Sequence, residues 1–281
     1  MTKYHLTADI LTSYGKYLQQ EERSPATVEK YMRDLRGFSA WLEGRAVTKR
    51  LAAGWKQELL DQGLSPATVN AKLSALNGLF RFLKWEDFRV RFLKLQRRVF
   101  RDTARDLGRE DYSRLLDAAK QLGREQLALI IETICATGIR VSEVRYITVE
   151  AVQAQRADVS LKGKIRTILL PKKLCRKLAK FAQKEKIASG EIFLTRRGTG
   201  VSRCAIWREM KALCAKAGVA PSKVFPHNLR HLFATAFYRA TRDIVKLADL
   251  LGHSSINTTR IYLLATGTEH ARQLELLRLV I

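Results

Sequence analysis

The sequence predicts a mainly helical protein of two domains with one small antiparallel β-hairpin. Three observations support this fold class. Apolar residues recur at helical spacing along most of the chain, a strongly basic segment separates two such regions, and one stretch alternates like a pair of strands. With 281 residues and 46% apolar residues, the chain is long and apolar enough for two packed cores.

The first predicted domain, residues 1–88, contains a short internal repeat. "SPATVEKYMRDLRGFSAWL" begins at Ser24 and "SPATVNAKLSALNGLFRFL" begins at Ser65. In each, Ser can cap a helix and Pro can occupy its first position, and an apolar stripe of helical period follows. With the periodic stretches before and between them, we expect a bundle of about four helices. The two stripes are Val28, Tyr31, Met32, Leu35, Phe38 and Leu42, and Val69, Leu73, Leu76, Phe80 and Leu83.

Residues 89–105 are predicted to be a basic linker. From Arg89 to Arg109 the chain has eight Lys or Arg against two Asp. Such a segment is either a solvated connector or a strap that lies along a polyanion, and the sequence leaves both open.

The second predicted domain, residues 106–281, is helical except for the hairpin. Helices are expected at "REDYSRLLDAAKQLG" and at "EQLALIIETICATG", which Gly138 ends. "ADVSLKGKIRTILLP" alternates on both sides of a Lys-Gly turn and predicts a hairpin over Val159–Leu170. Helices resume at "LCRKLAKFAQKEK" and continue to "RDIVKLADLLG", which Gly252 ends. A further helix is expected to begin near Ser255 and contain Tyr262, before a loop and a C-terminal amphipathic helix.

The charge of the chain points to a polyanionic partner. A formal net charge of +24 does not specify a fold, but it favours binding to nucleic acid over binding to an anionic membrane. The sequence has no run of about 18 apolar residues and no signal-peptide pattern at its start, so neither a membrane span nor secretion is expected. The four cysteines lack C-x-x-C spacing and indicate reduced thiols, which fits the cytoplasm.

Cationic and titratable residues gather at the start of one apolar helix, in "FPHNLRHLFATAF". If Asn228 caps this helix, Arg230 lies in its first turn, where free N–H groups favour an anion and a guanidinium can grip two phosphate oxygens. His227 can add a further donor. The alternative is a capped helix with a surface arginine and histidines satisfied by packing.

Further candidates stand alone elsewhere and mean little singly. Arg140 precedes a predicted Ser-capped helix that contains Glu143, and the hairpin turn holds Lys162 and Lys164. His253 follows Gly252, and Tyr262 comes nine residues later.

Taken in order, these residues resemble the tyrosine recombinase (phage integrase) family. The matching boxes are G-I-R-V-S-E at 138–143, K-G at 162–163, H-N-L-R-H at 227–231, L-G-H at 251–253 and Tyr262, and the layout is similar to Xer-type recombinases and mobile-element integrases. The resemblance covers nearly the whole chain. It implies a helical core-binding domain that clamps DNA and an α+β catalytic domain with a C-terminal helix.

The resemblance also implies an activity: DNA is cut and rejoined through a covalent 3′-phosphotyrosine on Tyr262. Such a phosphoryl transfer needs neutralised oxygens, an in-line nucleophile and an acid for the leaving oxygen. Arg140 and Arg230 match the arginines that grip the phosphate. Because the covalent link conserves the bond energy, no metal and no other cofactor is expected.

The remaining roles are also carried over from the family. His227 and His253 match flanking hydrogen-bond donors, and Glu143 matches an acidic position that orients its neighbours. Lys162 matches the lysine that protonates the departing 5′-oxygen, although the short turn leaves Lys164 as an alternative. His231 either supports packing or makes a contact behind the phosphate site.

The expected partners are double-stranded DNA with inverted-repeat arms and further copies of the chain in a tetramer, with a second recombinase or accessory factor left open. The protein is expected in the cytoplasm, associated with the nucleoid. The C-terminal helix is expected to dock on a neighbouring protomer, with closure of its own domain as the alternative. Candidate DNA contacts are Thr27, Lys30, Thr68, Lys72, Arg97 and Arg98.

Two rival functions are weighed against recombination. The first is a non-catalytic DNA-binding regulator or architectural protein on the same fold, which a complete residue set disfavours. The second is a metal-dependent nuclease built on His227, His231 and His253, which lacks the carboxylates that such sites use.

Overall fold

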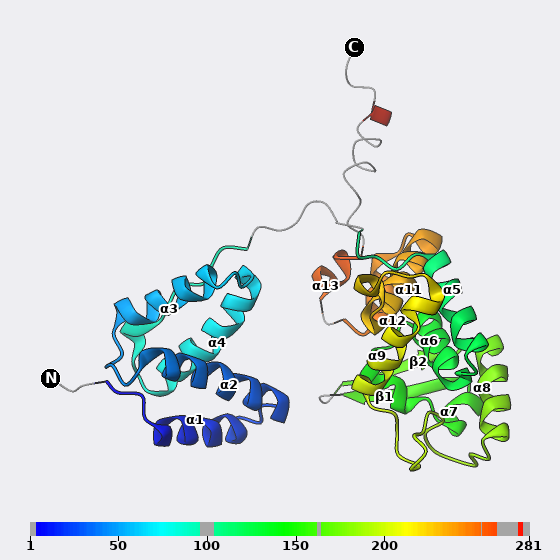
Figure 1. Ribbon diagram of the computed structural model, residues 1–281, viewed down its shortest axis with the longest axis horizontal. Coiled ribbons are helices and arrows are strands. Elements are labelled where there is room, and N and C mark those ends of the chain that lie inside the picture. Colours follow the sequence, from blue (N-terminus) through cyan, green and yellow to red (C-terminus); the bar gives the residue numbers. More distant parts are fainter. Residues whose placement is uncertain (1–3, 96–103, 162–163, 254, 263–274, 278–281) are drawn as a thin grey trace. The chain divides into compact units, whose positions relative to one another are not determined.

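In the computed structural model the chain folds into two compact units, residues 1–97 and residues 98–281. Both are built mainly from helices, and a single antiparallel hairpin is the only sheet among the residues described, so the predicted fold class is confirmed (Figure 1). The structure describes residues 4–95, 104–161, 164–253, 255–262 and 275–277.

The first unit is a helical bundle whose core comes from the predicted apolar stripes. Leu35, Phe38, Leu73 and Phe80 are fully buried, and the partly buried Leu83 packs at the edge of the core. Burial of such side chains stabilises the unit by about 1.5–3 kcal/mol each. The elements are α1 (Ala8–Gln20), α2 (Pro25–Leu42), α3 (Lys49–Asp61), α4 (Pro66–Phe82) and the 3₁₀ turn η1 (Glu86–Phe88).

The repeated "SPAT" segments start α2 and α4, with Pro at the first position of each helix, but the predicted serine cap forms at Ser65 and not at Ser24. In both, the Ser and Thr hydroxyls hydrogen-bond at 2.8 Å, Ser24 with Thr27 and Ser65 with Thr68. In α4 the Ser65 hydroxyl also accepts from the Thr68 N–H at 3.2 Å, as a cap does. The threonines therefore have a structural task at the helix starts.

Two asparagines of α4 tie the start of the predicted linker to this bundle. The Asn77 amide donates to the Val90 carbonyl at 2.9 Å and accepts from its N–H at 2.8 Å. Asn70, two turns earlier, binds both backbone groups of Leu93 at 2.9 and 2.8 Å. Val90 itself is buried in the core. Residues 90–93 thus form part of the first unit, held as a partner strand would hold them.

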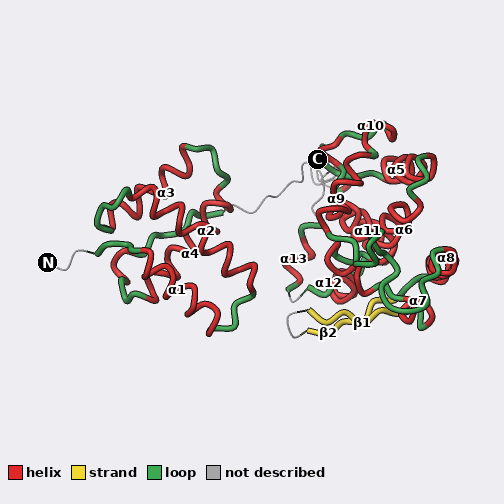
Figure 2. Tube along the Cα trace, turned by 60° about the horizontal axis from the view of Figure 1, so that its bottom comes forward, coloured by secondary structure: helices red, strands yellow, loops and turns green. Residues whose placement is uncertain are grey.

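The second unit packs its helices around α6 (Glu125–Thr137), whose Ile130, Ile131 and Ile134 are buried. Helices α5, α8 and α11 contact α6, and the hairpin lies at one edge of this helical body (Figure 2). The other elements are α5 (Arg109–Gln121), η2 (Val141–Tyr146), α7 (Val149–Gln153), α8 (Lys172–Lys184), α9 (Arg203–Ala212), α10 (Cys214–Ala217), η3 (Pro221–Lys223), α11 (Pro226–Thr241), α12 (Ile244–Leu251) and α13 (Ile256–Arg260).

The hairpin consists of β1 (Arg156–Leu161) and β2 (Lys164–Leu169), paired so that Leu161 faces Lys164. It begins three residues before the predicted start at Val159. Side chains alternate between its faces, with Val159 and Ile168 buried toward the helices and Ile165 exposed. The alternation that predicted the strands therefore also sets which residues of β2 point inward.

The end of the chain differs from the prediction in one detail. α13 begins after Ser255 as expected but ends at Arg260, so that Tyr262 lies in the turn that follows instead of within the helix. The predicted loop after Tyr262 and most of the predicted C-terminal helix lie outside the described residues, which omit 263–274 and 278–281.

Candidate active site

The turn that follows α6 brings Arg140 against two later helices. Gly138 ends α6 in the left-handed conformation, with φ +67°. A Cβ at this position would overlap the Phe233 ring of α11 and lie 3.1 Å from Leu251 of α12. Glycine is therefore required both by the backbone conformation and by the close packing of α11 and α12. Ile139 then turns into the core, and Arg140 leads out of it.

Glu143 is a buried carboxylate that holds Arg140 in place. Its side chain is 1% exposed and accepts from the Arg140 N–H at 2.7 Å and from Arg140 Nη1 at 2.8 Å. Arg166 Nη2 donates to the same carboxylate. The predicted Ser-capped helix is wrong: the segment is the 3₁₀ turn η2, and Glu143 reaches back to the backbone of Arg140. With 43% of its side chain exposed, Arg140 can still contact a molecule outside.

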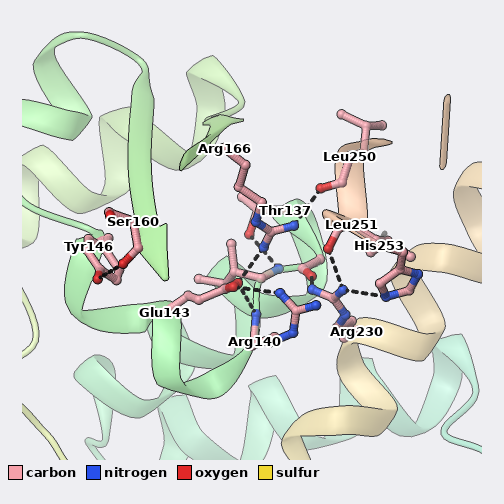
Figure 3. Close-up of polar contacts among 12 residues, drawn as sticks. Thr137, Arg140, Glu143, Tyr146, Ser160, Arg166, Arg230, Leu250, Leu251 and His253 are labelled. Atoms are coloured by element: carbon pink, nitrogen blue, oxygen red, sulfur yellow. Dashed lines mark hydrogen bonds and ion pairs between the residues drawn. The ribbon is translucent and has the colours of Figure 1, made fainter. Parts of the chain in front are cut away.

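Arg230, by contrast, is buried, with 3% of its surface exposed. Nη1 donates to the Gly138 carbonyl at 2.5 Å, and Nη2 donates to the Leu251 carbonyl at 2.7 Å (Figure 3). Burial and, after it, the nearby charge of Arg140 lower the pKa of Arg230, and the interaction with Tyr262 opposes them, so that the pKa is about 10. The guanidinium remains charged at neutral pH.

No carboxylate neutralises Arg230 among the described residues, because its partners are carbonyl oxygens and an imidazole. Arg140 lies close enough to lower the pKa of Arg166, and both lower the pKa of Arg230. One carboxylate, Glu143, pairs with Arg140 and Arg166. Three guanidinium groups against one carboxylate leave a local excess of two positive charges. A buried cation without a counter-ion is costly, so this cluster of arginines is electrostatically prepared for an anion.

Hydrogen bonding fixes the tautomer of His253. Arg230 Nη2 can only donate, so His253 Nε2, 2.9 Å away, must accept. The proton is therefore on Nδ1 and donates to the Thr259 hydroxyl at 2.9 Å. Burial, then Arg230 and the other two arginines, lowers the pKa of His253 to about 4, and the ring is neutral at pH 7. Burial, followed by Arg230, also lowers the pKa of His227.

Tyr262 is buried beside these groups, with 4% of its surface exposed. Three imidazoles surround its ring: His231 edge-on at 4.9 Å between centroids, His253 nearly parallel at 6.0 Å and His227 at 6.3 Å. The position of Tyr262 next to Arg230 also explains its effect on the arginine pKa. The tyrosine thus lies beside the cluster of arginines.

The start of α11 differs from the sequence prediction. Asn228 does not cap the helix, which begins at Pro226; its amide instead donates to the carbonyls of Arg105 at 2.8 Å and Lys223 at 2.7 Å. Arg230 follows in the next turn, with its side chain directed into the domain. The burial of Arg230 reflects its place between α6 and α12 more than any helix-terminus effect.

Several predicted residues lie elsewhere or outside the described part. Lys162, Arg97 and Arg98 are outside the described residues, as is the side chain of Lys164, whose backbone begins β2. Four predicted contacts belong to the first unit, where Lys30 and Lys72 both donate to the buried Asp34, at 2.7 and 3.3 Å. The other two are Thr27 and Thr68, which bond to their neighbouring serines.

Sequence reasoning missed Arg166. A signal was present, because Arg166 lies two residues before the inward-facing Ile168 on β2 and therefore shares its face. An arginine at an inward strand position needs a buried partner, and here it has Glu143.

Two further findings bear on other kinds of site. Across the residues described, no group of three or more His, Cys, Asp or Glu is arranged to hold a metal ion. In the same part of the chain, every helix is too short or too polar to cross a membrane.

Comparison with known proteins places both units in one family. Residues 105–268 match the phage integrase family, and residues 11–87 match the phage integrase N-terminal SAM-like domain. The chain is 29% identical over 277 residues to tyrosine recombinase XerA of Pyrococcus furiosus, which covers 95% of this chain and 93% of the relative. It is 32% identical over 276 residues to tyrosine recombinase XerD of Brucella suis, covering 87% and 89%.

Solved structures share the fold. XerH bound to its difH substrate in a pre-cleavage complex matches with a TM-score of 0.69 at 20% identity, over 95% of this chain and 84% of that one. A lambda integrase tetramer bound to a Holliday junction matches with a TM-score of 0.73 at 21% identity, over 93% of this chain and 78% of that one.

Proposed function

The chain belongs to the phage integrase family and is a site-specific recombinase that cuts and rejoins DNA, and we propose that the cluster of Arg140, Arg230 and His253 binds the phosphate that Tyr262 attacks. The observation that carries this proposal is the excess of positive charge around a buried tyrosine, with no carboxylate on Arg230 among the residues described. A phosphodiester supplies the missing negative charge.

The proposed step is a transesterification. Tyr262 Oη gives its proton to solvent and forms a bond to phosphorus, and the bond from phosphorus to the 5′-oxygen breaks. The departing oxygen gains a proton, for which the family resemblance implies Lys162, so the proton count is unchanged. In the reverse direction, the 5′-hydroxyl of the recombining strand attacks the 3′-phosphotyrosine and releases Tyr262.

Each described residue has a role in this proposal. Arg140 and Arg230 neutralise the non-bridging oxygens, whose charge grows in the transition state, and Glu143 holds Arg140 without reaching the phosphate. His227 and His253 donate to the same oxygens. For His253 this requires a proton on Nε2, which in the free protein accepts from Arg230.

His231 acts behind the reacting atoms in this proposal. Its ring contacts Tyr262 edge-on at 4.9 Å, and Thr235 lies within hydrogen-bonding distance of its Nδ1 at 3.4 Å. Orientation of the Tyr262 ring is the task that this geometry supports.

DNA is held mainly by charge, in keeping with the net charge of +24. In the first unit, Thr27, Lys30, Thr68 and Lys72 stay candidate contacts, together with Arg97 and Arg98 of the linker. Both lysines are bonded to Asp34 in the free protein, so DNA phosphates would compete with that carboxylate for them.

A tetramer on two DNA duplexes is the proposed assembly, supported by the lambda integrase tetramer with which this chain shares its fold.

The proposed C-terminal helix would link neighbouring protomers. Truncation after Gly267 should then abolish tetrameric complexes on DNA in native gels, whereas complexes that survive truncation would show that the helix closes its own domain. Recombination assayed with the purified chain alone tests whether an accessory factor or a second recombinase is needed. We place the protein with the nucleoid DNA of the cytoplasm.

The decisive experiment uses a nicked suicide duplex. Footprinting of the protein on its host locus identifies the inverted repeats. A nick beside the cleavage position lets the short cut fragment diffuse away, so that religation is prevented and the covalent adduct accumulates. Wild type should give a covalent protein–DNA band in EDTA, and Tyr262→Phe should give none. Binding without a band would support a non-catalytic regulator, which the recombinase relatives do not favour. Cleavage that EDTA abolishes would support a metal-dependent nuclease.

A further inference from the structure

Arg166 joins three segments that the proposed mechanism uses. It lies on β2, and its Nη2 donates to Glu143, which in turn holds Arg140. Its Nη1 donates at 2.9 Å to the carbonyl of Leu250, three residues before His253 (Figure 3). One guanidinium therefore connects the hairpin, the turn that carries Arg140 and the end of α12.

The side chain has little freedom to move. It is 15% exposed, and its Nε is buried with no hydrogen-bond partner in the part of the chain that the structure describes. Gly252 packs against it: a Cβ at Gly252 would lie 2.5 Å from Arg166 Cδ and 2.9 Å from its Nη1. The left-handed glycine that ends α12, at φ +63°, thus also makes room for this guanidinium. A donor left without a partner is costly, and it indicates that the other two nitrogens decide the orientation.

Arg166 is not placed to bind the phosphate itself. The charge of Arg166 is already paired with Glu143, and its side chain is only 15% exposed. Arg140 shares that carboxylate but leaves 43% of its side chain open to solvent, and Arg230 has no carboxylate partner among the described residues. The influence of Arg166 must pass through its neighbours. Glu143 is the shared neighbour, because one carboxylate pairs with Arg140 through Oε1 and with Arg166 through Oε2.

We propose that Arg166 is a positioning residue, which fixes Arg140 through Glu143 and the His253 turn through the Leu250 carbonyl so that both meet the same phosphate. This inference rests on the proposed function. Without Arg166, Glu143 keeps a single cationic partner and can turn with it, and the end of α12 loses its tie to the hairpin. Small displacements of groups that contact a reacting phosphate are expensive: about 1 Å corresponds to about a 100-fold loss of rate.

The test compares Arg166→Met and Arg166→Lys with Arg156→Met. Arg156 lies on β1 of the same hairpin and is exposed, so its substitution removes the same charge from the same hairpin. The single-turnover rate of covalent adduct formation is measured on the nicked duplex. We expect Arg166→Met to slow the reaction about 10- to 100-fold. Arg166→Lys should fall between it and wild type, since one ammonium cannot reach both partners. Arg156→Met should stay within about 2-fold of wild type.

A second substrate separates positioning from general damage to the fold. It carries a methylphosphonate at the scissile position, so that one charged oxygen is replaced by a methyl group and less charge needs neutralising. If Arg166 acts through Arg140, the ratio of the wild-type rate to the Arg166→Met rate should shrink toward one on this substrate. A merely structural defect would slow both substrates equally.

Two results would overturn the inference: an equal loss on both substrates, or an Arg166→Met rate like that of wild type. Should Arg166→Met fail to fold, the Arg166→Lys variant supports the same comparison. An absence of adduct with wild type would instead refute the proposed function, and the two failures are thus distinguishable.

Discussion

Replacement of Arg230 by lysine tests the proposed phosphate site most directly. The guanidinium spreads three hydrogen bonds over the Gly138 carbonyl, the Leu251 carbonyl and His253, at 2.5, 2.7 and 2.9 Å. A lysine ammonium keeps the charge but cannot span partners that lie on opposite sides of a planar fork. It should therefore lose both the preorganised donor to the phosphate and at least one internal bond.

The magnitude follows from these contacts. Loss of one preorganised donor costs about 3–4 kcal/mol of transition-state stabilisation, or about a 100- to 1,000-fold slower reaction. One buried carbonyl left without a donor costs about 1–3 kcal/mol of folding free energy. The adduct-forming rate on the nicked duplex measures the first effect, and thermal unfolding measures the second.

Arg239→Lys, at an exposed position of the same helix, is the matched control and should leave both quantities near wild type. A loss of less than 10-fold for Arg230→Lys, at unchanged DNA affinity, would refute the account of this arginine as a fixed ligand of the reacting phosphate.

Three other outcomes are expected. His253 has a pKa of about 4 in the free protein, and an anion beside it favours the protonated ring. Sulfate should therefore bind more tightly as the pH falls, and calorimetry should show that the protein takes up a proton when sulfate binds. If His253→Gln retains this pH dependence, the assignment is wrong. Asn77→Ala leaves both backbone groups of Val90 buried and unbonded, which should lower stability by about 1–3 kcal/mol per group and increase hydrogen exchange at residue 90. Asn70→Ala should lower stability less, because its partner Leu93 is half-buried. The reverse order would contradict the anchoring of residues 90–93 by these asparagines. Gly138→Ala should lower the unfolding temperature more than Gly123→Ala, because both glycines are left-handed but an added Cβ has no neighbour within 4 Å at Gly123; equal effects would show that the packing at Gly138 relaxes freely.

The sequence by itself determined the local elements and the set of reactive residues. Helices follow from the spacing of apolar residues and from their caps, as Ser65 at the start of α4 illustrates, and these signals lie within a few residues of one another. The hairpin followed from alternation in the same way. The identity and order of Arg140, Arg230, His253 and Tyr262 were also legible, because the family resemblance depends on short boxes.

Only the tertiary structure decided how these residues meet. Arg230 bonds to a carbonyl 92 positions away and Arg166 to one 84 positions away, and no local pattern encodes such pairs. The role of Glu143 as a partner of two arginines, the proton on His253 Nδ1 and the anchoring of residues 90–93 by two asparagines depend in the same way on packing between distant segments. Local periodicity fixes which face of a helix or strand is buried, whereas the partner that a buried polar group finds there is set by the elements that pack against that face.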